Sequence, residues 1–160
     1  MRRLTRPLIL ALVLCGASSP ASADITAFVG TTPTPTSRPV KGVALGVGLL
    51  VVGFEFEFAS TTEEPLDAAP SLRTGMGNVY VQTPIAIMGL RPYFTTGGGM
   101  YREQLGTRTE TNFGLNSGGG VKVSLFGPIR ARVDYRVFRL RGKPLHETVQ
   151  RFYAGLNLSF

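Results

Sequence analysis

Apolar and polar residues alternate along much of this chain. From Val52 to Ala59, phenylalanines at every second position are separated by glutamates. In an extended strand successive side chains point to opposite faces, so this order places the phenylalanines on one face and the glutamates on the other. The same alternation returns from Ile129 to Val137, with arginines and an aspartate as the polar members, and again over residues 148–160. These segments predict β-strands with one apolar and one polar face.

The pattern predicts an all-β chain of eight strands, because no part of it after Ala23 has sustained helical periodicity. The connections alternate between long segments (TPTPTSRPVK, TTEEPLDAAPSLRTGM, EQLGTRTETN and GKPLHE) and very short ones. This alternation is typical of an up-and-down meander with loops at one rim and turns at the other. The strands are expected over roughly 25–31, 42–50, 52–60, 77–86, 90–101, 113–125, 128–140 and 148–160.

The N-terminus has the features of a secretory signal peptide. Three arginines occur within the first six residues, followed by the apolar run Pro7–Cys15 and then by the small residues Ala21 and Ala23. The apolar run is shorter than the roughly 20 residues that a transmembrane helix needs. We therefore expect a signal peptide over residues 1–23 and a single mature domain over 24–160.

Removal of this segment changes the chemistry of the chain. Cys15 is the only cysteine, so the mature protein would have no disulfide and no thiol. A lipoprotein cut before Cys15 is disfavoured, because Leu14 stands where a small residue is needed. With three arginines removed from 17 basic residues, 14 remain against 10 acidic ones, and the formal charge falls from +7 to +4. A nucleic-acid partner therefore loses its main support, and we expect none.

Alternation alone allows two kinds of barrel. A soluble barrel places its apolar faces inside, whereas a membrane barrel places them outside. Phenylalanine and leucine are too bulky to fill an eight-stranded interior together, whereas charged residues among glycines suit a narrow lumen. We therefore predict an eight-stranded antiparallel up-and-down transmembrane β-barrel, and keep a soluble periplasmic barrel that binds a lipid or apolar ligand as the alternative. The predicted lumen charge network consists of Glu55, Glu57, Arg130, Arg132, Asp134 and Arg136.

These charges favour a filled lumen over an ion path. Buried charges are tolerated when they are paired. Eight strands leave room for side chains but not for an aqueous channel. The acids of one strand and the arginines of another can meet across such a lumen, and we expect them to close it.

The C-terminal half carries a family resemblance. In the last eight residues Tyr153, Gly155, Leu158 and Phe160 follow an order of polar residue, glycine, hydrophobic residue and terminal aromatic. Before them, FGLNSGGGVKVSLFGPIRARVDYRVFRL joins a glycine-rich strand to an arginine-bearing strand through a tight turn, and PYFTTGGGMYR precedes it. Over about residues 90–160 the chain resembles the small outer-membrane β-barrels of the OmpA, OmpX and opacity-protein type.

This resemblance implies a location and partners. It implies a monomeric barrel in the cell outer membrane of a Gram-negative bacterium, in contact with outer-membrane lipid and lipopolysaccharide. It also implies that the barrel-assembly machinery reads the C-terminal strand as an insertion signal.

The sequence offers one candidate for catalysis. His146 is the only histidine and stands beside Glu147, and lipid A deacylases on this fold use a His/Ser/Glu set. However, no serine lies near His146, and the His-x-Ser motif of those enzymes is absent. We therefore expect no catalytic residue, no cofactor and no metal site, and a structural or surface-interaction role. A lipid A-modifying enzyme is the less favoured third possibility.

Overall fold

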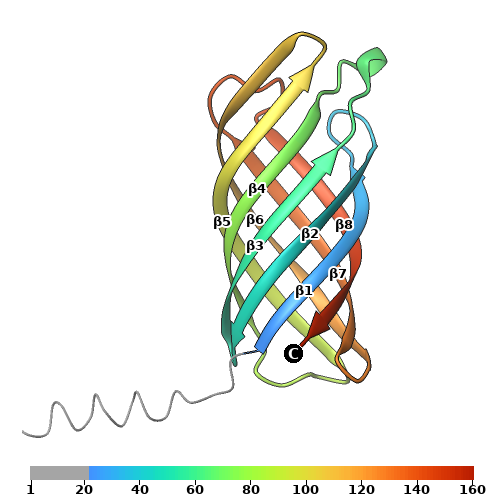
Figure 1. Ribbon diagram of the computed structural model, residues 1–160, viewed down its shortest axis with the longest axis vertical. Helices are drawn as coiled ribbons and strands as arrows, with labels where there is room; N and C mark the ends of the chain where they lie inside the picture. Colours follow the sequence, from blue (N-terminus) through green and yellow to red (C-terminus); the bar gives the residue numbers. More distant parts are fainter. Residues whose placement is uncertain (1–21) are drawn as a thin grey trace, which may run out of the picture.

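The computed structural model describes residues 22–160 and forms a closed β-barrel (Figure 1). Each strand pairs antiparallel with the next, and β1 pairs with β8 to close the sheet. A short 3-10 helix, η1 (Pro65–Asp67), lies in the β3–β4 loop. In the described part of the chain, no helix is long and apolar enough to span a membrane. The strands are β1 (Ser22–Thr32), β2 (Arg38–Leu49), β3 (Val52–Thr61), β4 (Ser71–Gln82), β5 (Leu90–Leu105), β6 (Arg108–Phe126), β7 (Ile129–Leu140) and β8 (Thr148–Ser159).

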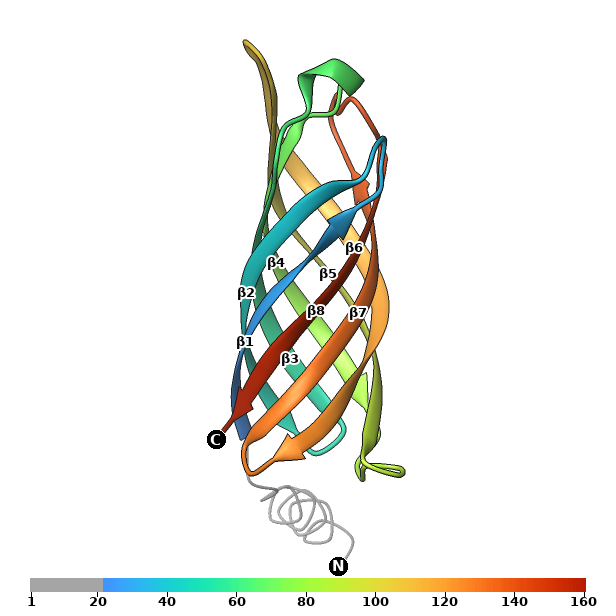
Figure 2. The same cartoon turned by 90° about the vertical axis from the view of Figure 1, so that its right-hand side faces the viewer.

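The two ends of the barrel differ in their connections. An even number of antiparallel strands returns the chain to the end where it started, so Ser22 and Ser159 lie at the same rim (Figures 1 and 2). This rim also holds the tight β2–β3 and β6–β7 turns. The opposite rim, which we call the loop end, carries the β1–β2, β3–β4 and β7–β8 loops and the tip of the β5–β6 hairpin.

The strands present their apolar faces outward. On β3, the side chains of Phe54, Phe56 and Phe58 are 59%, 48% and 52% exposed, whereas Glu55 and Glu57 are buried in the lumen. Large apolar side chains are exposed in the same way on the other strands, including Leu45, Val79, Phe94, Leu115, Val133 and Leu156. A soluble barrel that binds an apolar ligand needs the opposite arrangement. A band of outward apolar residues is the surface that a bilayer solvates.

The predicted signal peptide falls almost wholly outside the described residues, so the cleavage site stays a prediction. β1 begins at Ser22, and Ala23 is paired both with Val47 and with Phe160. The first strand therefore reaches two residues before the expected cut.

The predicted fourth strand was displaced toward the C-terminus. It was expected over 77–86, but β4 begins at Ser71 and ends at Gln82. Its first residues invert the usual pattern, because Leu72 points into the lumen and Arg73 points outward. An alternation search for outward apolar residues therefore misses them. At the other end, Pro84 lacks the backbone N–H that a further ladder bond requires.

The predicted long loop between the fifth and sixth strands was also wrong. Residues 103–112 were expected to form a loop, but β5 runs to Leu105 and β6 starts at Arg108, with a tight turn through Gly106 at a φ of +57°. This segment is polar on both faces, so it carries no alternation signal, although its backbone ladder is complete. By contrast, the β4–β5 connection spans 83–89 and is longer than the expected three residues.

The outward face of β3 provides a test of the membrane orientation. Replacement of Phe56 by Arg is expected to lower the free energy of unfolding in lipid vesicles by about 2–4 kcal/mol, because a charge would face hydrocarbon. Gln104→Arg, on the outer face of β5 close to the loop end, is expected to cost about 0–1 kcal/mol, because Gln104 is opposite the uncharged Ser71 and Thr109. Denaturant titration in vesicles measures both, with Phe56→Ala reporting the lost apolar area alone. Equal costs for the two arginine variants would contradict a lipid-facing β3.

Candidate functional site in the barrel lumen

A cluster of paired charges fills the middle of the lumen. Arg132 of β7 donates through Nε to Asp134 Oδ2 at 2.7 Å and also pairs with Glu55 of β3. Arg136, four residues further along β7 and on the same face, lies with Nη2 2.7 Å from Glu55 Oε1 and with Nη1 3.0 Å from Glu57 Oε2. The structure thus brings five of the six predicted charges together across the lumen.

Arg130 is the predicted member that does not join the cluster. It lies at the start of β7, close to the turn rim, and is only half-buried. Within residues 22–160 it forms no salt bridge, because the acids of β3 lie further into the lumen, at the level of Arg132 and Arg136. Its side chain can therefore be solvated from the rim.

Arg151 of β8 is a member of the cluster that the sequence interpretation missed. Its Nη1 donates to Glu57 Oε1 at 3.2 Å, and its guanidinium lies 4.4 Å from the centre of the Phe138 ring. Tyr153, two residues further on, donates its hydroxyl to Glu57 Oε2 at 2.8 Å. The alternation in the sequence places Arg151 and Tyr153 on the polar face of the last strand. However, this strand contains no acidic residue that would have suggested an ion pair.

A second ion pair joins strands that are distant in sequence. Lys122 of β6 donates to Asp24 Oδ2 of β1 at 2.9 Å, and both side chains are buried. The ammonium of Lys122 lies 5.0 Å from the centre of the Tyr80 ring. Sequence pattern could not reveal this pair, because neither residue stands in a run of alternating charges.

Glycine makes room for this polar core. A Cβ at Gly120 would lie 2.6 Å from the hydroxyl oxygen of Tyr93, too close for a real side chain. The Tyr93 hydroxyl needs that space, because it donates to Asp134 and accepts from Arg132 Nε at 2.6 Å. The glycine-rich segment of β6 is therefore explained by close packing against β5 and β7, because glycine lets neighbouring groups approach the backbone of the strand closely.

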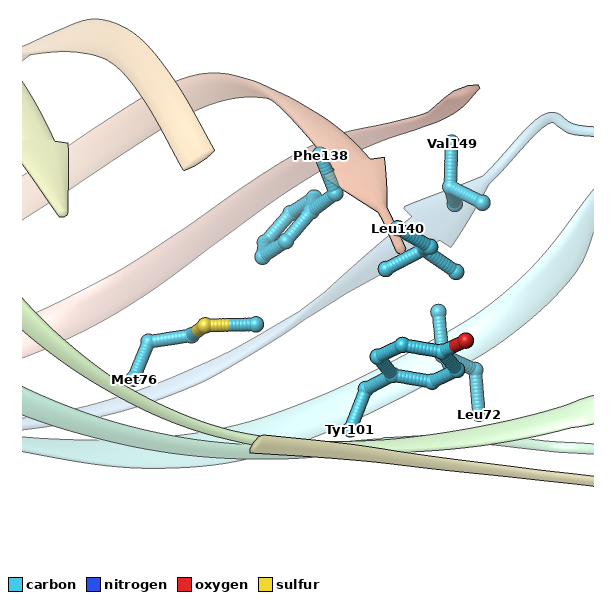
Figure 3. Packing of buried hydrophobic residues seen from close by; sticks show 6 residues of the cluster. All are labelled: Leu72, Met76, Tyr101, Phe138, Leu140 and Val149. Atoms are coloured by element: carbon cyan, nitrogen blue, oxygen red, sulfur yellow. The ribbon is translucent and has the colours of Figure 1, made fainter. Parts of the chain in front are cut away.

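An apolar layer lies between the charged cluster and the loop end. Figure 3 shows its side chains. Phe138 is completely buried and lies against Arg151. Tyr101 anchors the layer by donating its hydroxyl to the carbonyl of Arg141 at 2.5 Å. The layer has no charged group, so it separates the ion pairs from the loop rim. It consists of Leu72, Met76, Tyr101, Phe138, Leu140 and Val149.

The residues of the predicted insertion signal lie on both faces of β8. Tyr153 is buried in the lumen, whereas Leu158 and Phe160 are 45% and 68% exposed on the outer surface. Gly155 packs against Phe28 of β1, where a Cβ would lie 2.8 Å from the Phe28 Cβ. These positions serve barrel closure, and a role in recognition by the assembly machinery stays a prediction.

The candidate for catalysis has no supporting geometry. His146 lies half-buried in the β7–β8 loop, and in the described structure its imidazole is hydrogen-bonded to no serine and no carboxylate. A nucleophile requires a base within hydrogen-bond reach. Across residues 22–160, no three His, Cys, Asp or Glu side chains are grouped closely enough to hold a metal ion.

Comparison with known proteins defines the class by fold alone. No protein-family model matches the chain, and no characterised protein sequence is similar to it. Among solved structures, the N-terminal β-barrel domain of Pseudomonas aeruginosa OprF is similar with a TM-score of 0.63 and 17% identity, over 87% of this chain and 97% of that one. Neisserial surface protein A (NspA) is similar with a TM-score of 0.65 and 14% identity, over 88% and 96%.

An enzyme is also among the structural neighbours. The outer membrane enzyme PagL is similar with a TM-score of 0.55 and 13% identity, over 84% of this chain and 98% of that one. At this identity the likeness extends to the fold and not to the chemistry. The chain is thus a small eight-stranded β-barrel of the outer-membrane type, as the sequence resemblance implied.

The charge cluster predicts a large difference between two arginines of one strand. Arg136→Met leaves Glu55 and Glu57 with fewer partners in a buried site and is expected to cost about 3–5 kcal/mol of unfolding free energy. Arg130→Met, the same substitution at the half-buried rim position, is expected to cost less than about 1 kcal/mol. Denaturant unfolding in vesicles at neutral pH measures both. Similar losses for the two variants would contradict a paired lumen cluster centred on Arg136.

Proposed function

We propose that this chain is a non-enzymatic, integral outer-membrane protein with a structural or surface-interaction role, and that side chains close its lumen to ions. Two features support the proposal: the apolar residues on the outer surface and the side chains that fill the interior. The single observation that carries it is Arg136, which is fully buried and lies between Glu55 and Glu57 in the middle of the barrel.

The interior supports a closed lumen for two reasons. An ion that entered the charged cluster would have to displace partners that are 2.7–3.2 Å apart in a site without solvent access. Above the cluster, the apolar layer around Phe138 and Met76 offers an ion no polar ligand. Eight-stranded barrels are narrow enough for side chains alone to fill them.

The loop end supports a role in presenting a surface. The tip of the β5–β6 hairpin is tied to the β3–β4 loop, because Gly106 N–H donates to Glu63 Oε1 at 2.8 Å. On its other side, Arg108 donates to the carbonyl of Lys143 in the β7–β8 loop at 2.6 Å. These two hydrogen bonds therefore link the β3–β4 loop, the tip of the β5–β6 hairpin and the β7–β8 loop. A cross-linked rim offers partners a defined surface at a low ordering cost.

Planar-bilayer recording tests the closed lumen. We expect the purified, refolded protein to show no stable unit conductance, because no water-filled path crosses the cluster. If steps are seen, Glu57→Gln and Glu64→Gln distinguish their origin. A lumen path would change its ion selectivity with the buried Glu57 and not with Glu64 in the β3–β4 loop. Stable steps with that dependence would contradict the proposal.

A further inference from the structure

The outer surface carries a row of cations near the loop end. Lys41, Arg73 and Arg102 all point outward and are exposed. The register places them on one line across four strands, since Lys41 is opposite Ser60, Ser60 is opposite Arg73, and Arg73 is opposite Arg102. Neighbouring strands are about 4.8 Å apart, so the row spans about 15 Å.

No acidic residue of the strands faces outward beside this row. Six of the acidic residues lie in strands; five of them are buried in the lumen, and Glu110 lies opposite the buried Glu103 on the inner face. Within residues 22–160, the three cations form no salt bridge. Arg73 and Arg102 are moreover directly opposite each other, and like charges in this position destabilise a sheet. An anion held between them would remove that repulsion.

An apolar groove begins directly below the row. It has a volume of about 580 Å³, and its wall includes all three cations together with Val43, Phe58, Gly75 and Met100. In the register, Gly75 stands between Phe58 and Met100. Because glycine has no side chain, the backbone at Gly75 forms the floor of the groove between these two large side chains.

We propose that this surface binds the phosphorylated, multiply acylated glycolipid of the outer leaflet, lipid A. The inference rests on the proposed membrane location, in which the longer loops face outward and the row lies at the level of the outer headgroups. The guanidinium of an arginine binds phosphate through two parallel hydrogen bonds. Arg73 and Arg102 would hold one phosphate, Lys41 would approach a second, and an acyl chain would lie over Gly75. A phospholipid with a single phosphate would satisfy only part of the row.

Binding of lipid A to the refolded protein in detergent tests this site. The probe is hexa-acylated, bisphosphorylated lipid A, followed by native mass spectrometry. We expect K41Q/R73Q/R102Q to bind on the order of a hundredfold more weakly than the wild type, because three cation–phosphate contacts are lost. The charge-matched control R139Q/R141Q/K143Q removes three exposed cations from β7 and its loop, away from the groove, and is expected to change affinity by less than about twofold.

Two further arms examine the ligand and the groove. We expect monophosphorylated lipid A and phosphatidylglycerol to bind the wild type more weakly than the bisphosphorylated form. Gly75→Leu, which keeps all charges and fills the groove, is expected to weaken lipid A binding as well.

Three results would overturn the inference: equal losses in the two charge variants, equal binding of phosphatidylglycerol, or full binding by Gly75→Leu. Heat-modifiable migration on a gel reports folding of each variant. A wild-type chain that folds and inserts into vesicles but shows none of these preferences would refute only the lipid A site. A chain that fails to insert would refute the proposed function and the inference with it.

Discussion

The pairing of Glu57 inside the barrel is the interaction on which the rest of the structure depends. This carboxylate is fully buried and meets Arg136 of β7 at 3.0 Å, Arg151 of β8 at 3.2 Å and the hydroxyl of Tyr153 at 2.8 Å. Three strands are thereby joined across the lumen. Removing one partner of such a group is far more costly than the pair is stabilising, so the cluster specifies the arrangement of strands as much as it adds stability.

The same pairing determines which solvent the outside can meet. A shift of β3 by one residue would turn Glu55 and Glu57 outward and bring the phenylalanines into the lumen. With the acids paired inside, the remaining faces are apolar and suited to lipid. The charges that do appear outside are then confined to the edge of the apolar band, where Lys41, Arg73 and Arg102 lie together. The charged lumen, the apolar outer surface and the cations near the loop end are thus all consequences of one alternation of polar and apolar residues in a closed sheet.

The sequence predicted the parts of the barrel where that alternation is strong. β3, β7 and β8 were placed correctly to within a few residues, and five charges of the cluster came from two of them. The start of β4 and the β5–β6 hairpin were missed, because above the apolar band neither face needs to be apolar. Arg151 and the Lys122–Asp24 pair were missed for a different reason. Their partners lie on strands that come within reach only through the closure of the barrel and the register of its strands. The local pattern of residues reveals neither the closure nor the register.

The central claim is that the lumen charges are paired and shielded from water, and arginine side-chain exchange measures this most directly. In ¹⁵N-arginine-labelled protein, the Nε–H of Arg132 donates to Tyr93 and Asp134 inside the lumen, whereas Arg130 on the same strand lies half-buried at the rim. We expect the Nε proton of Arg132 to exchange with water at least about tenfold more slowly than that of Arg130. Equal exchange rates at the two sites would contradict it.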